Sequence, residues 1–251
     1  MDRGSLGLPP TISACLFDLD GVLTQTARVH ATAWKATFDG FLKQRAERTG
    51  EWFKPFDPVA DYDEYVDGKP REDGVRSFLA SQRITLPEGS EDDPPEADTI
   101  HGLGNRKDQL FLHLIRTHGV ETYEGSVRYL HAAKDAALKV AVVTSSRNCS
   151  EVLRAARLEG IFDAQVDGIV AHARRLAGKP APDTYLEAAR MLGATASGSA
   201  VYEDALAGVE AGRAGRFGLV VGVDRMGQAT ALRQHGADVV VKDLAELIKT
   251  T

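Results

Sequence analysis

Residues 15–24 read CLFDLDGVLT, an apolar run that ends in two carboxylates one residue apart, Asp18 and Asp20. The apolar run itself covers Ile12–Phe17 and is bounded by turn-forming residues. A short apolar run with such boundaries predicts a buried strand. Because two like charges at the end of a strand repel each other, the rest of the chain must explain why the pair is tolerated.

Further buried strands and helices are predicted along the chain from its apolar patterns. Strands alternating with helices predict an α/β fold with a Rossmann-like, doubly wound parallel sheet. Helices on both faces of such a sheet explain why its strands are continuously apolar. The predicted strands are Val140–Val143, Ala200–Tyr202, Leu219–Val223 and Val239–Val241, and the predicted helices are Val127–Leu138, Ser150–Leu158, Asp183–Leu192 and Ala205–Ala214.

The region from about residue 27 to residue 118 breaks this alternation, because it contains amphipathic helical patterns and no convincing strand. The helical patterns are Val29–Leu42, Glu72–Ser81 and Lys107–Thr117. We therefore predict an α/β core domain formed by residues 1–26 and 119–251, and an inserted helical domain formed by residues 27–118. The stretch GLGNRK at Gly102–Lys107 resembles a phosphate loop, but no strand precedes it, so we predict a turn at a helix start.

Composition excludes several classes of function. The 251-residue chain has a net charge of −6, which does not suit a general binder of nucleic acid or of anionic membranes. No apolar run approaches the ~18 residues that span a membrane, and the N-terminal stretch has no apolar core of a signal peptide. Two cysteines give no disulfide framework. We expect a cytoplasmic monomer that acts on a small molecule.

Polar side chains follow the predicted strands or precede the predicted helices, and ligands bind at the carboxyl ends of strands in an open parallel sheet. Taken singly, each has an ordinary explanation as a turn, a cap or a surface residue. Together they place four carboxylates, a hydroxyl cluster and one lysine at one edge of the sheet. These residues are Asp18, Asp20, Thr144, Ser145, Ser146, Lys179, Glu203 and Asp204.

Crowded carboxylates are tolerable around a divalent cation, and Mg²⁺ prefers one or two carboxylates together with waters and phosphate oxygens. Asp18 and Asp204 are the natural side-chain ligands. One aspartate of the first pair can then attack phosphorus while the other acts as acid and base. Lys179 would neutralise charge on the phosphoryl oxygens, and Thr144 or Ser145 would donate a hydrogen bond to them.

The stretches FDLDGVLT, VVTSS, GKPAPD and YEDALAG resemble the four motifs of the haloacid dehalogenase superfamily of phosphohydrolases and phosphomutases. The insertion resembles the helical cap of the first type in that superfamily. The resemblance implies that Asp18 is the nucleophile and Asp20 the general acid and base. It also implies Mg²⁺ held by Asp18, the backbone carbonyl of Asp20 and Asp204, with Glu203 at or near the ion. Thr144 and Lys179 would bind the transferring phosphoryl group.

Three further stretches are similar to β-phosphoglucomutases. QTARVHATAWK matches the segment after the first motif, DGKPRED resembles the cap loop whose arginine binds the non-transferring phosphate, and TSSRN matches the substrate loop. Asp67 departs from that pattern because a lysine is expected there, and Lys69 is the candidate for its role. Further departures are Gln25, where an Asp is common, and extra residues around Trp52–Tyr65. The substrate-binding residues implied are Thr26, His30, Gly68, Lys69, Arg71, Ser145, Ser146, Arg147 and Asn148.

The resemblance favours a mutase that converts β-glucose 1-phosphate to glucose 6-phosphate, primed by glucose 1,6-bisphosphate. A phosphatase, in which water attacks the aspartyl phosphate, uses the same residues and is the alternative. A phospho-receiver domain also combines an α/β fold with acidic residues, a Ser or Thr and a Lys. That class predicts a compact domain, and the inserted ~90 residues argue against it.

Overall fold

The computed structural model describes residues 4–249. By its internal contacts the chain divides into two compact units. The first comprises the described parts of 1–25 and 120–251, and the second comprises Thr26–Gly119. Over the described residues, no helix is both long and apolar enough to cross a membrane.

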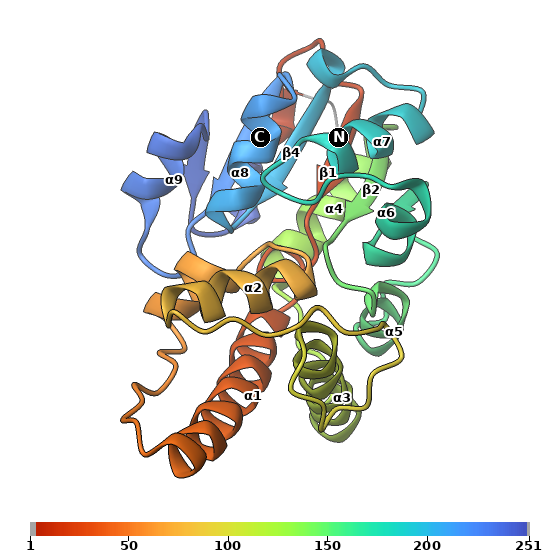
Figure 1. Cartoon of the computed structure of the whole chain (residues 1–251). Coiled ribbons are helices and arrows are strands. Elements are labelled where there is room, and N and C mark those ends of the chain that lie inside the picture. The colour runs from red at the N-terminus through yellow and green to blue at the C-terminus, as the bar shows by residue number, and fades with distance from the viewer. Residues whose placement is uncertain (1–3, 250–251) are drawn as a thin grey trace. The chain divides into compact units, whose positions relative to one another are not determined.

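The first unit contains a six-stranded parallel sheet, as predicted, with the order β3-β2-β1-β4-β5-β6 (Figure 1). In the centre of the sheet, Phe17 lies opposite Val142 on one side and Tyr202 on the other. The carboxyl ends of these three strands therefore lie level with one another. The strands are β1 (Ala14–Phe17), β2 (Lys139–Val143), β3 (Ala164–Val166), β4 (Ser199–Glu203), β5 (Leu219–Val223) and β6 (Val239–Val241).

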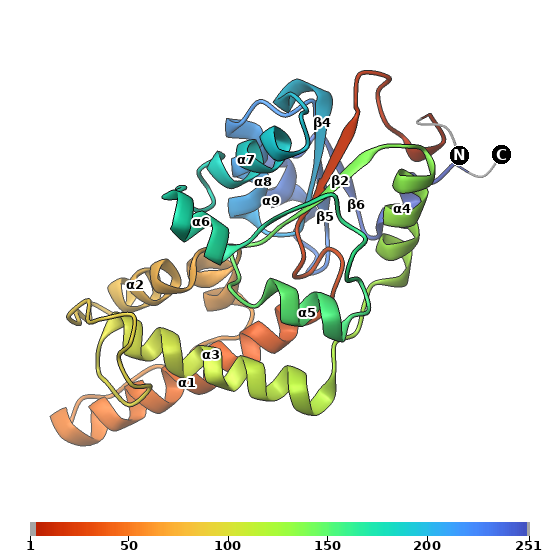
Figure 2. The same cartoon turned by 90° about the vertical axis from the view of Figure 1, so that its right-hand side faces the viewer.

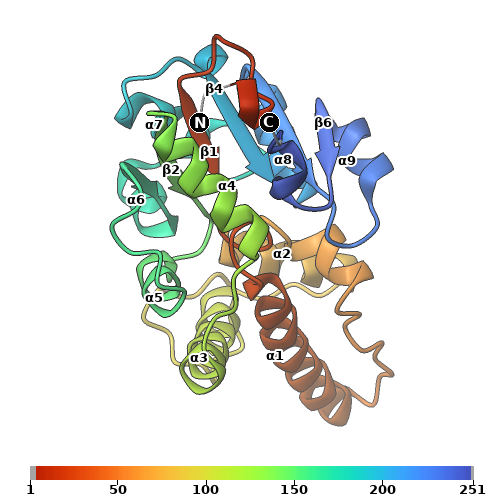
Figure 3. The same cartoon turned by 180° about the vertical axis from the view of Figure 1, so that it is seen from behind.

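Helices cover both faces of the sheet (Figures 2 and 3). Helices α7 (Asp183–Met191), α8 (Leu206–Ala214) and α9 (Ala229–His235) pack on one face, and α4 (Glu124–Asp135) packs on the other together with the short helices η1 (Gly4–Leu6) and η4 (Leu244–Leu247). The remaining elements of this unit are α5 (Cys149–Ala155), α6 (Gly168–Arg174) and η3 (Ala196–Gly198).

Helix α8 packs closely on the sheet because two of the residues that face it are glycines. A Cβ on Gly212 would lie 3.1 Å from the side chain of Val220. A Cβ on Gly208 would lie 1.8 Å from a carboxylate oxygen of Glu203. The second of these close approaches brings the helix directly against the end of β4, where the polar residues gather.

The second unit is helical, with α1 (Thr26–Thr49), a single π-helical turn η2 (Tyr62–Val66), α2 (Arg71–Ser81) and α3 (Ile100–His118). Helices α1 and α3 lie side by side (Figures 1 and 2). The prediction for Gly102–Lys107 is wrong, because these residues lie inside α3 and not in a turn that precedes it. The Thr99 hydroxyl caps the helix by accepting from the Gly102 N–H at 2.9 Å.

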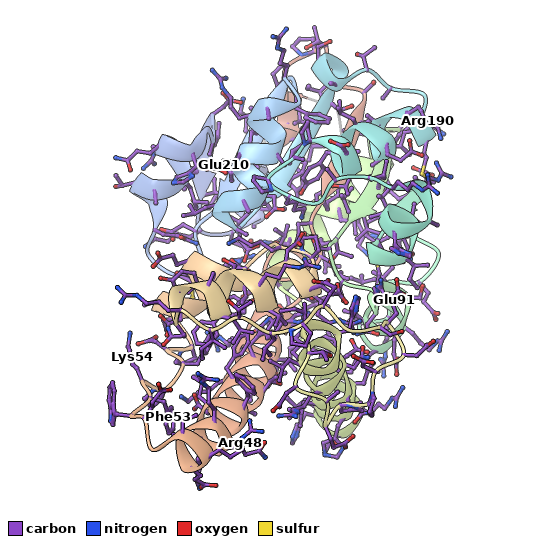
Figure 4. All side chains as sticks on the ribbon, in the orientation of Figure 1. Arg48, Phe53, Lys54, Glu91, Arg190 and Glu210 are labelled. Carbon is purple, nitrogen blue, oxygen red and sulfur yellow. The ribbon has the colours of Figure 1, made fainter. Side chains whose placement is uncertain are left out.

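The extra residues after α1 are anchored in the core of this unit by Phe56, which is buried against Phe38 and Phe78. Its backbone is also fixed, because its N–H donates to Asp39 and its C=O accepts from Lys35, both at 2.8 Å. Figure 4 shows Phe53 and Lys54 on the loop beyond the end of α1. Tyr62 is also buried in this core, and Phe53 and Tyr65 pack against it, whereas Trp52 is exposed.

Candidate active site

Asp18 is the first residue after β1, and the sheet itself fixes its backbone. Its N–H donates to the Tyr202 C=O at 2.9 Å, which extends the β1–β4 ladder by one residue. The strand before it is fully buried, and the Asp18 side chain is only 9% exposed. The sequence therefore places a carboxylate in an apolar setting, where it needs partners.

Lys179 supplies that partner. Its Nζ donates to Asp18 Oδ1 at 2.5 Å and also to Glu203 Oε1, and the lysine side chain is 1% exposed. The Tyr185 hydroxyl donates to the same Glu203 oxygen at 2.9 Å, and the Ala205 N–H donates to the other at 3.1 Å. One ammonium thus bridges two buried carboxylates at the carboxyl ends of the neighbouring strands β1 and β4.

Asp204 completes an acidic cluster with Asp18 and Glu203, in which one carboxylate oxygen from each residue lies within 4.8 Å of the others. All three residues are buried. Gly21 lies against the Asp204 carboxylate, since a Cβ on Gly21 would stand 1.7 Å from Oδ2, and its φ of +91° also favours glycine. The glycine after Asp20 is therefore required both by its backbone conformation and by the space that Asp204 needs.

Asp20 and Thr144 meet at the ends of the adjacent strands β1 and β2. The Thr144 hydroxyl donates to Asp20 Oδ2 at 3.0 Å and accepts from the Ser146 N–H at 3.1 Å. The Ser146 hydroxyl in turn accepts from the Asn148 N–H at 3.1 Å. These bonds give the loop of Ser145, Ser146, Arg147 and Asn148 a defined shape beside Asp20.

Lys179 lies between the Asp18 and Glu203 carboxylates, and the carboxylates of Asp20 and Asp204 are close by. Burial raises the pKa of Asp18 well above its usual value, and Lys179 offsets this only in part. Burial alone would lower the pKa of Lys179, but the Asp18 and Glu203 carboxylates outweigh burial and raise it, so the lysine stays protonated. The lysine therefore acts as a fixed cation.

A divalent cation fits the cluster of Asp18, Glu203 and Asp204. Carboxylate oxygens are hard ligands, and one oxygen from each of the three groups lies within 4.8 Å of the others. An added cation would offset the cost of burying them. Cys149 is unsuited to reactive chemistry, since burial raises the pKa of its thiol.

His30 and Lys107 form a buried pair in the helical unit that the sequence did not reveal. The Lys107 Nζ lies 2.5 Å from His30 Nδ1, and the His30 ring stacks on Phe111 with centroids 4.0 Å apart. The two residues are 77 positions apart and come from α1 and α3, so no local pattern connects them. Thr26, one turn before His30 on α1, is buried as well.

The other predicted cap residues surround the start of α2. Arg71 begins this helix and is paired with Glu72 at 3.0 Å and with Asp108 of α3 at 3.2 Å. The Lys69 ammonium donates to the Glu64 C=O and to the Ser77 hydroxyl, both at 3.1 Å. Gly68 has a φ of +69° in the turn before the helix, a conformation that favours glycine. Arg71 and Lys69 are therefore held by groups of their own unit.

Comparison with known proteins identifies the family. The profile of haloacid dehalogenase-like hydrolases matches residues 12–216, which is most of the chain. The chain belongs to the haloacid dehalogenase family. A phospho-receiver domain is thereby excluded.

Relatives within this family carry a more specific name. The chain is 58% identical to a protein named "Beta-phosphoglucomutase" from Mycobacterium tuberculosis, over 97% of this chain and 94% of that protein. It is 33% identical to a protein of the same name from Bacillus subtilis, over 94% and 92% of the two chains. The resemblance to β-phosphoglucomutase-like members of the haloacid dehalogenase family, and the expectation of an enzyme, are confirmed.

A solved structure titled as a beta-phosphoglucomutase from Clostridium difficile has the same fold. It superposes with a TM-score of 0.73 at 24% identity, and the match covers 94% of this chain and 93% of that one. At this level of identity the likeness concerns the fold alone. It agrees with the α/β architecture predicted for a haloacid dehalogenase family member.

Proposed function

We propose that this enzyme is a β-phosphoglucomutase that converts β-glucose 1-phosphate to glucose 6-phosphate. The observation that carries the proposal is the buried Asp18–Lys179–Glu203–Asp204 cluster, in a chain 58% identical to proteins of that name. An aspartate held by an ammonium at a strand end suits nucleophilic attack on phosphorus. We further propose that the helical insertion, with predicted bounds 27–118, is the cap of such an enzyme.

In the proposed reaction, an Asp18 oxygen attacks a phosphorus atom of glucose 1,6-bisphosphate and the bond from phosphorus to the sugar oxygen breaks. Asp20 gives its proton to that departing oxygen. The monophosphate substrate then offers its free hydroxyl, Asp20 takes the hydroxyl proton, and the sugar oxygen attacks the phosphoryl group on Asp18. This step restores the Asp18 carboxylate and forms the bisphosphate again, so the proton and the phosphoryl group both balance over the cycle.

Asp18, Asp204 and the backbone carbonyl of Asp20 would hold Mg²⁺, with Glu203 at or near the ion. The ion would neutralise negative charge on the transferring phosphoryl group. Lys179 holds Asp18 in place and provides a second positive charge for the phosphoryl oxygens, and the Thr144 hydroxyl donates a hydrogen bond beside Asp20. The loop of Ser145, Ser146, Arg147 and Asn148 contributes to sugar-phosphate binding in this proposal.

The residues of the helical unit provide the remaining contacts. Arg71 would bind the non-transferring phosphate through its planar fork, with help from Lys69 and the Gly68 turn. Thr26 and His30 would contribute to substrate binding from α1. A phosphatase would use the same core residues and differ only in allowing water to attack the aspartyl phosphate.

The direct test is to incubate the protein with β-glucose 1-phosphate, MgCl₂ and a trace of glucose 1,6-bisphosphate. We expect glucose 6-phosphate to form in large excess over free phosphate, and little turnover without the bisphosphate or with excess EDTA. If free phosphate is the sole product with every sugar phosphate offered, the mutase proposal is wrong and the phosphatase alternative replaces it.

A further inference from the structure

Arg225 is the second residue after β5, and its side chain contacts several segments of the chain although the proposed function gives it no role. Its side chain is 11% exposed. It donates from Nε to the Gly21 C=O at 2.8 Å, and from Nη2 to the Val22 C=O at 3.2 Å and the Ser126 hydroxyl at 3.1 Å. From Nη1 it donates to the Lys242 C=O at 2.6 Å.

The aromatic ring of Tyr123 completes these surroundings, with the guanidinium carbon of Arg225 3.5 Å from the ring centroid. Arg225 Nη1 also pairs with Asp243 Oδ2 at 3.4 Å. One side chain therefore contacts three separate segments, residues 21–22, 123–126 and 242–243. Arginine suits this task because its fork presents five N–H donors in fixed directions. A lysine at the same position has three donors around one nitrogen atom and cannot reach all of these acceptors at once.

Gly21 and Val22, whose carbonyls accept from Arg225, belong to the loop that follows Asp18 and Asp20. The Gly21 N–H donates to the Thr24 C=O at 2.7 Å, and the Thr24 N–H and hydroxyl both donate to the Leu19 C=O at 3.0 Å. These bonds close the loop on itself, and the Arg225 bonds to Gly21 and Val22 tie the closed loop to the end of β5. The position of Gly21 matters because it touches the Asp204 carboxylate.

The same β5–α9 loop also reaches Asp204 directly. The Gln228 side-chain amide donates to the Asp204 C=O at 3.1 Å, and the Gln228 N–H donates to Asp224 Oδ1 at 2.7 Å. The loop from Asp224 to Gln228 is therefore bonded both to the segment after Asp20 and to the residue after Glu203. It connects the first and the last of the four motifs without contributing a ligand or a nucleophile of its own.

We propose that Arg225 is a positioning residue that fixes the Gly21–Val22 peptide against Asp204, and thereby sets the geometry of the metal and phosphoryl site. This inference rests on the proposed function for the identity of the site. It assigns to the β5–α9 loop a part in phosphoryl transfer. Without Arg225, the carbonyls of Gly21 and Val22 lose their charged donor, and the peptide next to Asp20 becomes free to shift.

The test compares Arg225→Ala and Arg225→Lys with wild type and with Met226→Ala. Met226 is the neighbouring residue in the same loop, and its side chain is exposed. For Arg225→Ala we expect kcat to fall by about 10- to 100-fold, with KM for the sugar phosphate within about twofold. The MgCl₂ concentration that gives half-maximal rate should rise several-fold. Arg225→Lys should lie between alanine and wild type, and Met226→Ala should match wild type.

A second measurement separates positioning from a structural role. In wild type, MgCl₂ should raise the thermal midpoint of unfolding, and in Arg225→Ala this rise should shrink. If Arg225→Ala only lowers the midpoint, while kcat, the MgCl₂ requirement and the MgCl₂-induced rise stay unchanged, the inference is overturned. If Arg225→Ala does not fold, Arg225→Lys and Gln228→Ala decide by the same criteria.

The outcome does not depend on the mutase reaction itself. The same variants are assayed on Mg²⁺-dependent hydrolysis of p-nitrophenyl phosphate, which requires only metal, nucleophile and phosphoryl binding. If wild type lacks mutase activity but hydrolyses this ester, the mutase proposal fails while the role of Arg225 is still tested. Equal hydrolysis by wild type and Arg225→Ala at limiting MgCl₂ would contradict the role of Arg225.

Discussion

The Asp18 side chain is held in a position that suits chemistry better than stability. It is buried beside two other carboxylates, and burial raises its pKa because the charged form is disfavoured. Lys179 bridges Asp18 and Glu203, and so it would keep one partner if Asp18 lost its charge. A neutral side chain of the same shape at position 18 would therefore remove the proposed nucleophile and relieve the repulsion among the carboxylates.

For Asp18→Asn we expect turnover to fall by at least about 10³-fold, because the amide cannot attack phosphorus. In metal-free buffer with EDTA, we expect the free energy of unfolding to stay within about 1 kcal/mol of wild type or to rise. Turnover assays and chemical denaturation check the two parts. A variant that retains normal turnover would show that Asp18 is not the nucleophile.

At this scale the sequence predicted which core residues lie together at the strand ends, but it did not predict the contacts of Arg225 and Lys107. Asp18, Thr144, Glu203 and Asp204 were found because each follows a predicted strand at the carboxyl edge of a parallel sheet. The same rule applies to Arg225, which lies just after β5, but the carbonyl groups that accept its hydrogen bonds cannot be identified from the sequence. Lys107 carried no such signal, because its contact with His30 joins two helices far apart in the sequence.

Among the elements, the strands that the sequence predicted are those with continuous apolar runs. Strand β3 was missed because it has only three residues, Ala164–Val166, with Gln165 in the middle. The prediction for β1 began two residues early, at Ile12, because apolar character continues before the ladder starts. Helix α1 extends to Thr49, beyond the predicted end at Leu42, since its last two turns are polar and carry no apolar periodicity.

Strand β2 is joined to the segment before β3 by the Asp163 side chain. Asp163 Oδ2 accepts from the Val140 N–H at 2.9 Å, and Oδ1 accepts from Lys134 of α4 at 3.4 Å. Burial raises the pKa of Asp163, but the Val140 N–H and the Lys134 ammonium outweigh it, so the pKa lies below the ordinary 3.8. The ionised form is therefore bound more favourably in the folded state than in the unfolded state.

Because the folded pKa is depressed, the stabilisation by Asp163 is present above about pH 4 and is lost as the pH falls through the folded value. We expect Asp163→Asn to lower the free energy of unfolding by about 1 kcal/mol at pH 7, and by progressively less below pH 4. Urea denaturation at several pH values measures this, with the exposed Asp135→Asn as the control. A difference from wild type that does not vary with pH would assign the effect to shape instead of charge.

For the whole molecule, the sequence indicated two parts because the strand–helix alternation stops between residues 27 and 118. The structure has two compact units, and it moves each predicted boundary by one residue, to Thr26 and Gly119. An inserted unit needs its own apolar core, and the apolar residues of α1, α2 and α3 form one. The internal pairing of Arg71 was not readable, because Asp108 lies on a different helix.

A mutase must bind a sugar that carries two phosphate groups, whereas a hydrolase of a simple phosphate ester needs to bind only one phosphate group. In the proposed mutase, Lys179 would bind one phosphoryl group and Arg71 would bind the other, and the Arg71 guanidinium is oriented by its pairs with Glu72 and Asp108. Because Glu72 and Asp108 compete with a phosphate for the Arg71 guanidinium, phosphate binding there gains less free energy than it would from an unpaired arginine. Loss of a charge-assisted contact of this kind costs roughly 2–4 kcal/mol, which corresponds to about 30- to 1000-fold.

We therefore expect Arg71→Ala to lower kcat/KM for β-glucose 1-phosphate by about 30- to 1000-fold, while hydrolysis of p-nitrophenyl phosphate changes less than about threefold. Arg71→Lys should recover only part of the loss, since a lysine keeps the charge but not the fork. Arg76→Ala is the matched control, because Arg76 also lies on α2 and is paired with two carboxylates, Asp73 and Glu88. Equal losses in both activities for Arg71→Ala would make Arg71 a structural residue of the helical unit, and the choice between mutase and phosphatase would then depend on other residues.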